Sequence, residues 1–383
     1  MKQILLFVMV FASISLCAIN QSTFLFLSFE PSSINRAMGG GVTGVVNIWH
    51  NNPLTVYTNP AVSAFHEGFA YGYSKEDWGD AFGIRDMFYN SSMLTYGYKG
   101  VAIMLPGYNA SDRFGITFDM GMQHVTDSSG QDLGDFHSYD HATTYGIALN
   151  AFETYRKLAM IDHTWMKYVD LAIGANYIDV HSQLAPAIGF TDSGVNADER
   201  SLNIGGIARL SYCYDRTLAF EAVYGLSHFN VEANEAQYID EVEADPIWSH
   251  RNQGYALGVS LKGEKLAAPL IPEQFRFFDN LLTFRYLNAA LDPLYYTSER
   301  ITGSGIEFGF LDTFFIRNGQ YDDDAGHING KTSGYGINLH YRNLLGFSYN
   351  YAEVPGVEIF QTRKTKDYSV NIDFINLFQV LRN

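Results

Sequence analysis

The chain has 383 residues, of which 15% are aromatic and only 17% charged, and its formal net charge is −16. This negative charge argues against nucleic acid as a partner, because nucleic-acid binding rewards basic surfaces. Beyond the N-terminus no apolar run reaches the ~20 residues that a transmembrane helix needs, which excludes helical membrane spans. Membrane strands need only about ten alternating residues each, so a β-barrel fits the length and the composition.

The first residues predict a secretory signal peptide, residues 1–17. Lys2 supplies its positive charge, and Ile4 to Leu16 forms an apolar core of the expected length. Cleavage after Cys17 and cleavage after Ala18 both fit the small residues found there. The chain is therefore expected to be exported.

The next segment, residues 18–64, differs in character from the rest of the chain. Its consecutive glycines allow positive φ and close backbone approach. Its asparagine before proline is typical of a helix start, with Asn59 as N-cap and Pro60 at the first helical position. A phosphate-binding loop is the alternative, but the lysine and the βαβ context of such loops are missing. The residues singled out in this segment are Arg36, Gly39, Gly40, Gly41, Asn59, Pro60 and Ala61.

Fourteen stretches between Phe65 and Phe378 alternate apolar and polar residues. In the last of them Tyr368 and Val370 point one way and Ser369 and Asn371 the other, because successive strand side chains face opposite sides. Tyr and Phe dominate the apolar face, as in the aromatic girdles of outer-membrane barrels, whereas Val, Ile and Leu usually dominate in a soluble sandwich or propeller. The expected strand centres are Ala70, Gly97, Thr117, Gly146, Ile173, Ile207, Val223, Leu257, Phe284, Ile306, Phe315, Ile337, Tyr349 and Ile372. Residues 65–383 are thus predicted to form an all-β, antiparallel outer-membrane barrel of about 14 strands.

The connectors between these strands alternate in length. Tight hairpins are predicted at Tyr214 to Thr217, Leu311 to Thr313, Arg342 to Leu344 and Pro106 to Ser111. Long loops are predicted at Glu76 to Asn90, Thr126 to Asp140, His181 to Asp198, Asn230 to His250, Gln320 to Gly330 and Glu353 to Thr365. Outer-membrane barrels have short periplasmic turns and long external loops, so the alternation indicates which end faces outward. Phe152 to Lys167 and Gly263 to Asn280 are long yet belong to the short set, which is compatible with short periplasmic helices.

The long loops are acidic, above all Asn230 to His250 and the run Asp322 to Asp324. Carboxylate oxygens suit Ca²⁺, so a cation site is one interpretation. No EF-hand spacing is present, and a solvated, self-repelling loop is the favoured interpretation. Neither a metal nor a cofactor is expected.

No motif in the sequence predicts catalysis. His137 and His141 have a spacing that suits metal binding on a helix, but their surroundings are typical of a loop that runs into a strand. A Ser-His-Asp site has no fixed sequence order, so a barrel phospholipase stays open on that ground alone. No nucleophile elbow points to one. The remaining Cys213 is expected to pack in its strand.

Several short motifs of the chain resemble those of the PorV/PorQ family of outer-membrane proteins, which is related to FadL-type fatty-acid transporters. The motifs that carry the resemblance are Arg36 to Gly40, Asn59 to Ala61, Gly305 to Phe308, Phe315 to Gly319, Gly334 to Asn338 and Phe347 to Ala352. The resemblance implies a fourteen-stranded barrel with an N-terminal plug or hatch, to which the Asn-Pro-Ala element belongs. Trp49 to Asn52 depart from the family pattern, and the chain closes with residues 379–383 instead of a terminal aromatic residue.

The sequence therefore favours a non-enzymatic barrel in the outer membrane of a Gram-negative-type bacterium, with outer-membrane lipid around it. In one variant it passes hydrophobic small molecules, as FadL-type relatives do. In the other it is a PorV-like component that binds secretion-system proteins. The alternative of a different class is a soluble or surface-attached β-protein that binds glycans.

Overall fold

The computed structural model describes residues 24–78, 86–126, 132–158, 160, 163–185, 195–238, 244–263, 278–294, 299–324, 326–341, 344–356 and 362–374. The predicted signal peptide lies outside these residues, as do Phe378 and residues 379–383.

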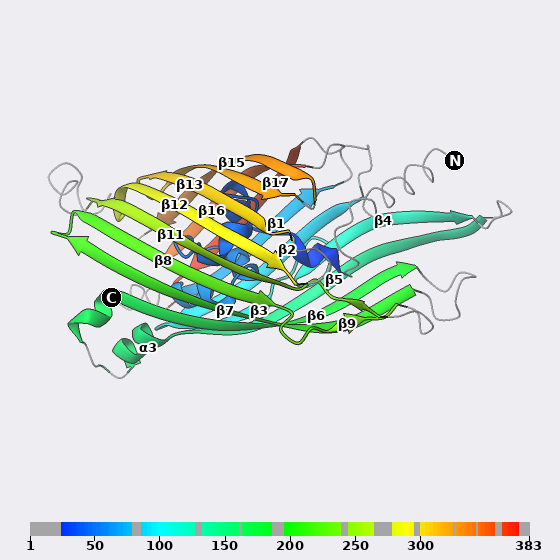
Figure 1. The fold of residues 1–383 in the computed structure, drawn as a ribbon, viewed down its shortest axis with the longest axis horizontal. Helices are drawn as coiled ribbons and strands as arrows, with labels where there is room; N and C mark the ends of the chain where they lie inside the picture. The colour runs from blue at the N-terminus through cyan, green and yellow to red at the C-terminus, as the bar shows by residue number, and fades with distance from the viewer. Residues whose placement is uncertain are drawn as a thin grey trace.

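One antiparallel sheet closes on itself, because its first strand pairs with its last (Figure 1). Its strands are β1 (Gly68–Asp77), β2 (Phe88–Tyr98), β3 (Val101–Pro106), β4 (Ile116–Thr126), β5 (Asp132–Asn150), β6 (Val169–Ala185), β7 (Val195–Tyr214), β8 (Leu218–Phe229), β11 (His250–Lys262), β12 (Asn280–Pro293), β13 (Ile301–Phe310), β14 (Phe314–Asp323), β15 (Ile328–Tyr341), β16 (Leu345–Pro355) and β17 (Thr362–Ile372). Two further short strands, β9 (Glu235–Ala236) and β10 (Asp245–Pro246), pair only with each other. Closure removes free edge strands from the ring itself, which is the condition for a sheet to cross a bilayer. Only the projecting ends of strands such as β4 and β7 lack a neighbour on one side in the described residues.

Strands β3 and β4 occupy the same position in the ring, since each pairs with β2 on one side and β5 on the other. The fifteen strands of the sheet therefore make a barrel of fourteen positions. The prediction of a tight hairpin at Pro106 to Ser111 was wrong. The hairpin turn lies earlier, at Lys99 and Gly100, and residues 107–115 interrupt a strand instead of joining two.

The two ends of the barrel differ. The turn end carries tight connections, such as Asp215 to Thr217 and Leu311 to Thr313, together with the start of β1 and the end of β17. The predicted helices after β5 are present there as α3 (Ala151–Leu158) and η6 (Thr164–Lys167). The loop end carries the longer connections. In outer-membrane barrels the end that carries the short turns faces the periplasm.

Several loops are shorter than predicted, because the strands at the loop end continue further. β4 runs to Thr126 and β5 begins at Asp132, while β6 and β7 extend to Ala185 and from Val195. Figure 1 shows these long hairpins projecting at the right of the barrel. These hairpin ends carry polar residues on both faces and therefore show no alternation of apolar and polar residues. The strand ends predicted from that alternation consequently lie short of the observed ones.

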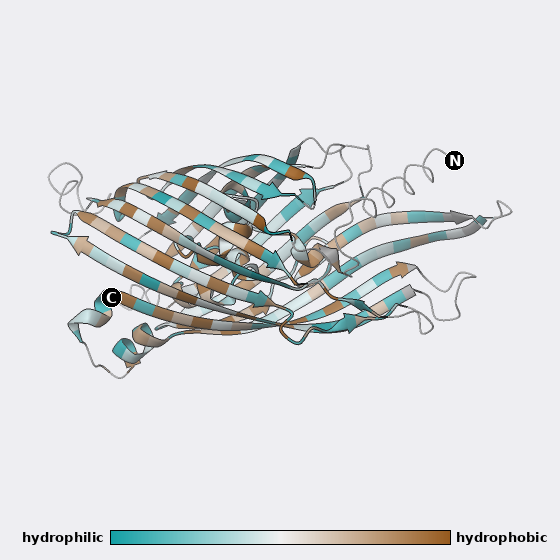
Figure 2. Cartoon of the chain, in the orientation of Figure 1, coloured by the Kyte–Doolittle hydropathy of each residue, from teal (hydrophilic) through white to brown (hydrophobic). Residues whose placement is uncertain are grey.

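The outward face carries an apolar band edged by rings. Figure 2 shows the alternation of hydrophobic and hydrophilic residues along the strands. Tyrosines pair directly across strands at the loop-side edge of the band, including Tyr73 with Tyr368 and Tyr224 with Tyr255. At the turn-side edge Tyr212 pairs with Phe220. All of these rings except the half-buried Tyr73 are exposed, and no second layer of the described chain covers them, which fits contact with lipid.

The inward face of the barrel carries mainly small and polar side chains. A luminal segment, defined as Phe24 to His66, packs against this face. The segment consists of the short helices η1 (Leu25–Ser28), α2 (Ser33–Ala37), η2 (Val42–Val46), η3 (Pro53–Tyr57) and η4 (Pro60–Phe65). Nearly all of its side chains from Pro31 onward are buried, and Figure 1 shows it in blue inside the ring of strands. None of the helices in the described residues is long and apolar enough to span a membrane.

The apolar band predicts that the free-energy cost of a charged substitution depends strongly on its depth along a single strand face. Leu257 and Gln253 both face outward on β11, Leu257 within the band and Gln253 beyond Tyr255 at its edge. We expect Leu257→Arg to lower the free energy of unfolding from lipid by about 2–4 kcal/mol and Gln253→Arg by no more than about 1 kcal/mol. Denaturant titration of the protein refolded into vesicles measures both. Equal losses would contradict a lipid-facing band.

Candidate functional site

The luminal segment contacts most of the strands, so its contacts with the wall define the candidate site. Helix α2 lies against β14 to β17, η2 against β8 and β11 to β13, and η3 and η4 against β1 to β3 and β5 to β7. All seven residues that the sequence analysis singled out lie in this segment, and six of the seven are buried, Gly41 included. They make three separate contacts with the wall: the glycine run, the Asn-Pro-Ala element, and Arg36 of α2.

The glycine run forms the first contact. Gly39, Gly40 and Gly41 all have positive φ, at 114°, 69° and 109°. A Cβ on Gly39 would lie 2.8 Å from the backbone nitrogen of Ser304 on β13, and one on Gly40 would lie 2.1 Å from the ring of Tyr321 on β14. The close approach and the backbone conformation both require glycine.

The Asn-Pro-Ala element forms the second contact. Asn59 accepts a hydrogen bond from the Ala61 backbone nitrogen at 3.0 Å, and Pro60 occupies the first position of η4, as predicted. The Asn59 amide also donates to the Val45 carbonyl at 2.8 Å and to the Gly206 carbonyl of β7 at 3.4 Å. The cap therefore fixes η4 to both the segment and the wall.

The same cap occurs a second time at Asn52, which belongs to the stretch Trp49 to Asn52 that departs from the family pattern. The Asn52 side chain accepts from the Leu54 nitrogen at 3.1 Å, with Pro53 at the first position of η3. Its amide donates to Asp367 on β17 at 3.0 Å. The repeated asparagine-proline pair was the signal that could have revealed it.

Wall glycines receive the segment. A Cβ on Gly305 would lie 2.5 Å from Met38, one on Gly225 2.2 Å from the Val45 carbonyl, and one on Gly174 2.6 Å from Ala61. The segment backbone thus lies directly on the strand backbone. The sequence shows glycine at inward positions of these strands. Its function as a contact for the segment follows only from the path of the segment.

Arg36 ties the segment to the wall near the loop end. Its guanidinium donates to Glu76 on β1 at 2.5 Å and to Thr365 on β17 at 2.7 Å, and it also contacts the Glu30 carbonyl. Arg363 lies 3.5 Å from the same Glu76. The charge of Arg36 is therefore matched inside the barrel, which a buried charge requires.

A buried polar network joins the segment to β12, β13 and β14. His50 Nε2 lies 2.7 Å from the Glu307 carboxylate, which also accepts from Arg317 at 2.7 Å and contacts Arg285. Arg317 donates onward to Asn350 at 2.9 Å. Charged residues at inward strand positions are the sequence signal for this network, which was not predicted.

The network continues to the start of α2. Asn350 donates to Asp367 at 2.8 Å, and Asp367 accepts from the Ser33 backbone nitrogen at 2.6 Å. One connected chain of hydrogen bonds therefore runs from His50 through the wall back to α2. It fixes two points of the luminal segment at once.

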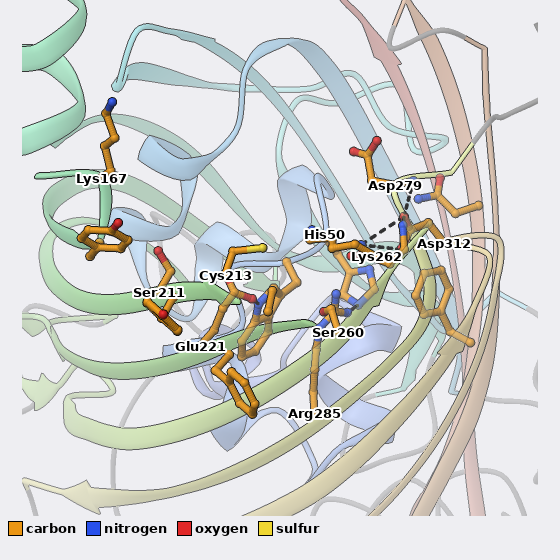
Figure 3. Close-up of a pocket in the computed structure, with 18 of the residues that line it drawn as sticks. His50, Lys167, Ser211, Cys213, Glu221, Ser260, Lys262, Asp279, Arg285 and Asp312 are labelled. Atoms are coloured by element: carbon orange, nitrogen blue, oxygen red, sulfur yellow. Dashed lines mark hydrogen bonds between the residues drawn. The ribbon is translucent and has the colours of Figure 1, made fainter. Parts of the chain in front are cut away.

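A cavity of about 640 Å³ lies between the segment and the turn end. Trp49 and His50 of the segment form one side, and the wall contributes Glu221, Lys262 and Arg285 (Figure 3). The Trp49 indole donates to Glu221 at 2.6 Å. The cavity is a polar vestibule on the turn-end side of the segment.

The wall is interrupted on the opposite side of the segment, where residues 107–115 leave it between β3 and β4. The Tyr71 hydroxyl, on the outer face, donates to the Tyr108 carbonyl at 2.7 Å, so the excursion projects outward. The neck is held by Ser92, whose nitrogen donates to the Gly115 carbonyl at 2.9 Å. On the inside, the Tyr57 hydroxyl of the segment donates to the Ser92 carbonyl at 3.1 Å.

The histidine pair considered for metal binding lies on one strand, β5, which does not bring its members together as a helix would. His137 lies 2.7 Å from Asp119, and His141 is 3.3 Å from the Thr117 hydroxyl. Within the described ranges no cluster of three or more His, Cys, Asp or Glu side chains could hold a metal ion. Part of the acidic loop at Asn230 to His250 lies outside those ranges.

Comparison with known proteins gives structural likeness only. No protein-family model matches the chain, nor does any curated protein. The toluene transporter TodX of P. putida matches with 12% identity over 90% of this chain and 99% of that one, at a TM-score of 0.42. A FadL homologue of Pseudomonas aeruginosa matches with 10% identity over 90% and 98%, at 0.39. The toluene transporter TbuX of Ralstonia pickettii matches with 12% identity over 89% and 97%, at 0.36. The resemblance to PorV/PorQ stays a prediction.

The glycine run predicts a local effect of substitution. Gly39→Val places a β-branched side chain at positive φ and against the β13 backbone, which we expect to weaken the docking of the luminal segment by at least about 1–3 kcal/mol. Gly206→Val is the matched control, because a Cβ there meets no atom closer than 3.8 Å. Hydrogen exchange of amides in residues 30–58 measures the effect. Equal protection in the two variants would contradict the packing described above.

Glu30 predicts a pH dependence of the same docking. Burial raises the pKa of Glu30 from 4.5 to about 7, against the opposing effect of hydrogen bonds from Thr58 and Ser32. The docked segment therefore binds a proton that the undocked one releases, so this contribution is complete below pH 4.5 and is lost as the pH rises through 7. We expect exchange protection, corrected for intrinsic rates, to fall across this range in the native chain and to stay level in Glu30→Gln. Glu232→Gln, in an exposed loop, is the control and should keep the native slope.

Proposed function

We propose that the chain is a non-enzymatic outer-membrane channel for hydrophobic small molecules, opened by displacement of part of the luminal segment. The closed barrel with its apolar outer band supports the membrane location. The observation that carries the proposal is the interrupted wall at residues 107–115, with Tyr57 of the segment behind it. The neck of this excursion is closed only by hydrogen bonds, among them one from the Gly115 nitrogen to the Gly107 carbonyl at 2.8 Å. A site that parts there toward the band would suit a substrate that partitions into lipid.

The surface behind the interruption is apolar. Val56 and Tyr57 of the segment and Met93, Met104 and Ile116 of the wall are all buried there. Displacement of η3 would expose this surface inside the barrel, where an apolar molecule would replace the lost contacts.

With the segment in place, polar contacts block the path of an apolar molecule from the apolar surface to the turn end. The vestibule at the turn end is lined by charged and polar side chains and is separated from the apolar surface by the segment. An apolar molecule would thus enter through the apolar side and leave through the vestibule once η3 and η4 have moved. No bond is made or broken in this scheme.

A second candidate is a protein-binding role of PorV type. The observation that favours it is the segment itself, which fills the lumen as a barrel that does not conduct would require. The long hairpins at the loop end would then contact the partner. A glycan-binding surface is less favoured, because the exposed rings encircle a closed barrel and form no groove in the described residues.

Uptake into vesicles tests the proposal. The variants Tyr57→Ala, Gly39→Val and Pro60→Leu each loosen the seal behind residues 107–115 or the docking of the segment, so we expect toluene to enter several-fold faster through each. Tyr57→Phe keeps the ring and loses only the hydrogen bond to Ser92, so its effect should be smaller. Folding of every variant is checked by heat-modifiable gel migration.

Arabinose is the polar control solute, and its entry through Tyr57→Ala should stay slow. Unchanged toluene entry in all three loosened variants would overturn the gating role of the segment. Co-purification of the native chain with a large secretion assembly, combined with that result, would favour the PorV-type role instead.

A further inference from the structure

The helix α3 and the turn η6 at the turn end of the barrel have an unusual orientation. Figure 1 shows α3 to one side of the strands and not across the lumen. Ala151, Phe152, Tyr155 and Leu158 fall within a single arc of this helix, because residues three and four apart share a face. No residue of the helix is buried.

The polar face of α3 is the one fixed to the barrel. The Thr154 hydroxyl donates to the Lys99 carbonyl at 3.1 Å, and Lys157 forms ion pairs with Glu67 and Glu153. Arg156 donates to the Met166 carbonyl of η6 at 3.1 Å. An amphipathic helix in water turns its apolar face toward the protein, and α3 does the opposite.

The apolar face is therefore directed away from the rest of the described chain. Tyr155 is 43% exposed, Leu158 56%, Met160 89% and Trp165 50%. The rings of Phe152 and Trp165 contact edge to face at 5.2 Å, which holds α3 and η6 together as one surface. We call Phe152, Tyr155, Leu158, Met160 and Trp165 the apolar foot.

The apolar foot continues the lipid-facing band. The chain passes from β5 directly into α3 and from η6 directly into β6. Tyr168 follows η6 and contacts Tyr212 of the turn-side girdle, with ring centroids 6.0 Å apart. The exposed Leu171 comes next on β6. The exposed Lys167, which lies between Trp165 and Tyr168 on this path, lines the vestibule.

We propose that the apolar foot lies in the periplasmic leaflet of the outer membrane, at the boundary of phospholipid headgroups and acyl chains. Aromatic side chains with a polar tip, such as Tyr155 and Trp165, suit this boundary. The polar face of α3 then stays against the barrel and the periplasm. The foot anchors the turn end and fixes the depth of the barrel. The inference rests on the proposed membrane location.

Spin labels test the inference in vesicles of phosphatidylethanolamine and phosphatidylglycerol. Single cysteines replace Tyr155 and Leu158 in a background of Cys17→Ser and Cys213→Ser. Ile147→Cys reports the lipid-facing band, and Arg216→Cys reports the water at a tight turn of the same end. We expect the labels at 155 and 158 to resemble that at 147, relaxed several-fold more by oxygen than by a water-soluble nickel chelate.

Each other outcome overturns the inference. Labels at 155 and 158 that resemble the label at 216 would place the foot in water. Labels shielded from both relaxants would show a protein cover. If the label at 147 also behaves as in water, the membrane location itself is wrong, so failure of the foot and failure of the proposed function can be told apart.

Tryptophan fluorescence gives an independent test without cysteine variants. Trp248 is buried, Trp49 packs against the wall inside the barrel and Trp78 stacks on Phe29 of the luminal segment, whereas Trp165 is half exposed. Lipids brominated near the headgroup should quench a fraction of the native emission, and Trp165→Phe should remove that fraction. Equal quenching with and without Trp165 would contradict the proposal.

Discussion

The width of the closed sheet is the constraint on which the rest of the structure depends. About eight strands enclose an interior that side chains alone can fill, and this barrel has fourteen positions. Its inward residues are mostly small, with Gly174, Gly225 and Gly305 among them. The remaining space is taken by the luminal segment, whose backbone lies directly on the strand backbone. The apolar interior that a soluble protein builds from its own sheets is here supplied by about forty residues that precede the barrel.

Filling a polar lumen requires matched polar groups. The charges of Arg36, Glu307 and Arg317 are almost fully excluded from solvent, and each has a partner of opposite charge. Removing one partner of such a pair costs far more than the pair contributes, because the remaining charge stays buried. The network therefore specifies one position of α2 and of His50 against the wall more strongly than apolar packing would.

The sequence predicted the part of this architecture that depends on alternation. All fourteen expected strand centres lie in strands, and the Asn59 cap with Pro60 starts a short helix. Alternation of apolar and polar residues is lost where both strand faces meet water, so the extended hairpins were predicted as loops. The short strand Val101–Pro106 was not distinguished from the strand predicted around Gly97. The network around Glu307 joins residues far apart in the sequence. Only the closed register places them together, so no local pattern could give it.

The contacts of the luminal segment are unequal, and this inequality indicates which part can move. Helix α2 and His50 are held by charges and short hydrogen bonds to β1, β13 and β17. Helices η3 and η4 meet β1 to β3 and β5 to β7 mainly through apolar side chains. Their polar ties to the wall are fewer: the Asn52 cap of η3 donates to Asp367 at 3.0 Å, and the Asn59 amide reaches the Gly206 carbonyl only at 3.4 Å. Leaving the first set would strand buried charges, whereas leaving the second exposes a surface that an apolar ligand can cover. The interrupted wall lies beside the second set. The proposed opening would therefore displace the segment beside residues 107–115, while the charged contacts keep α2 and His50 in place.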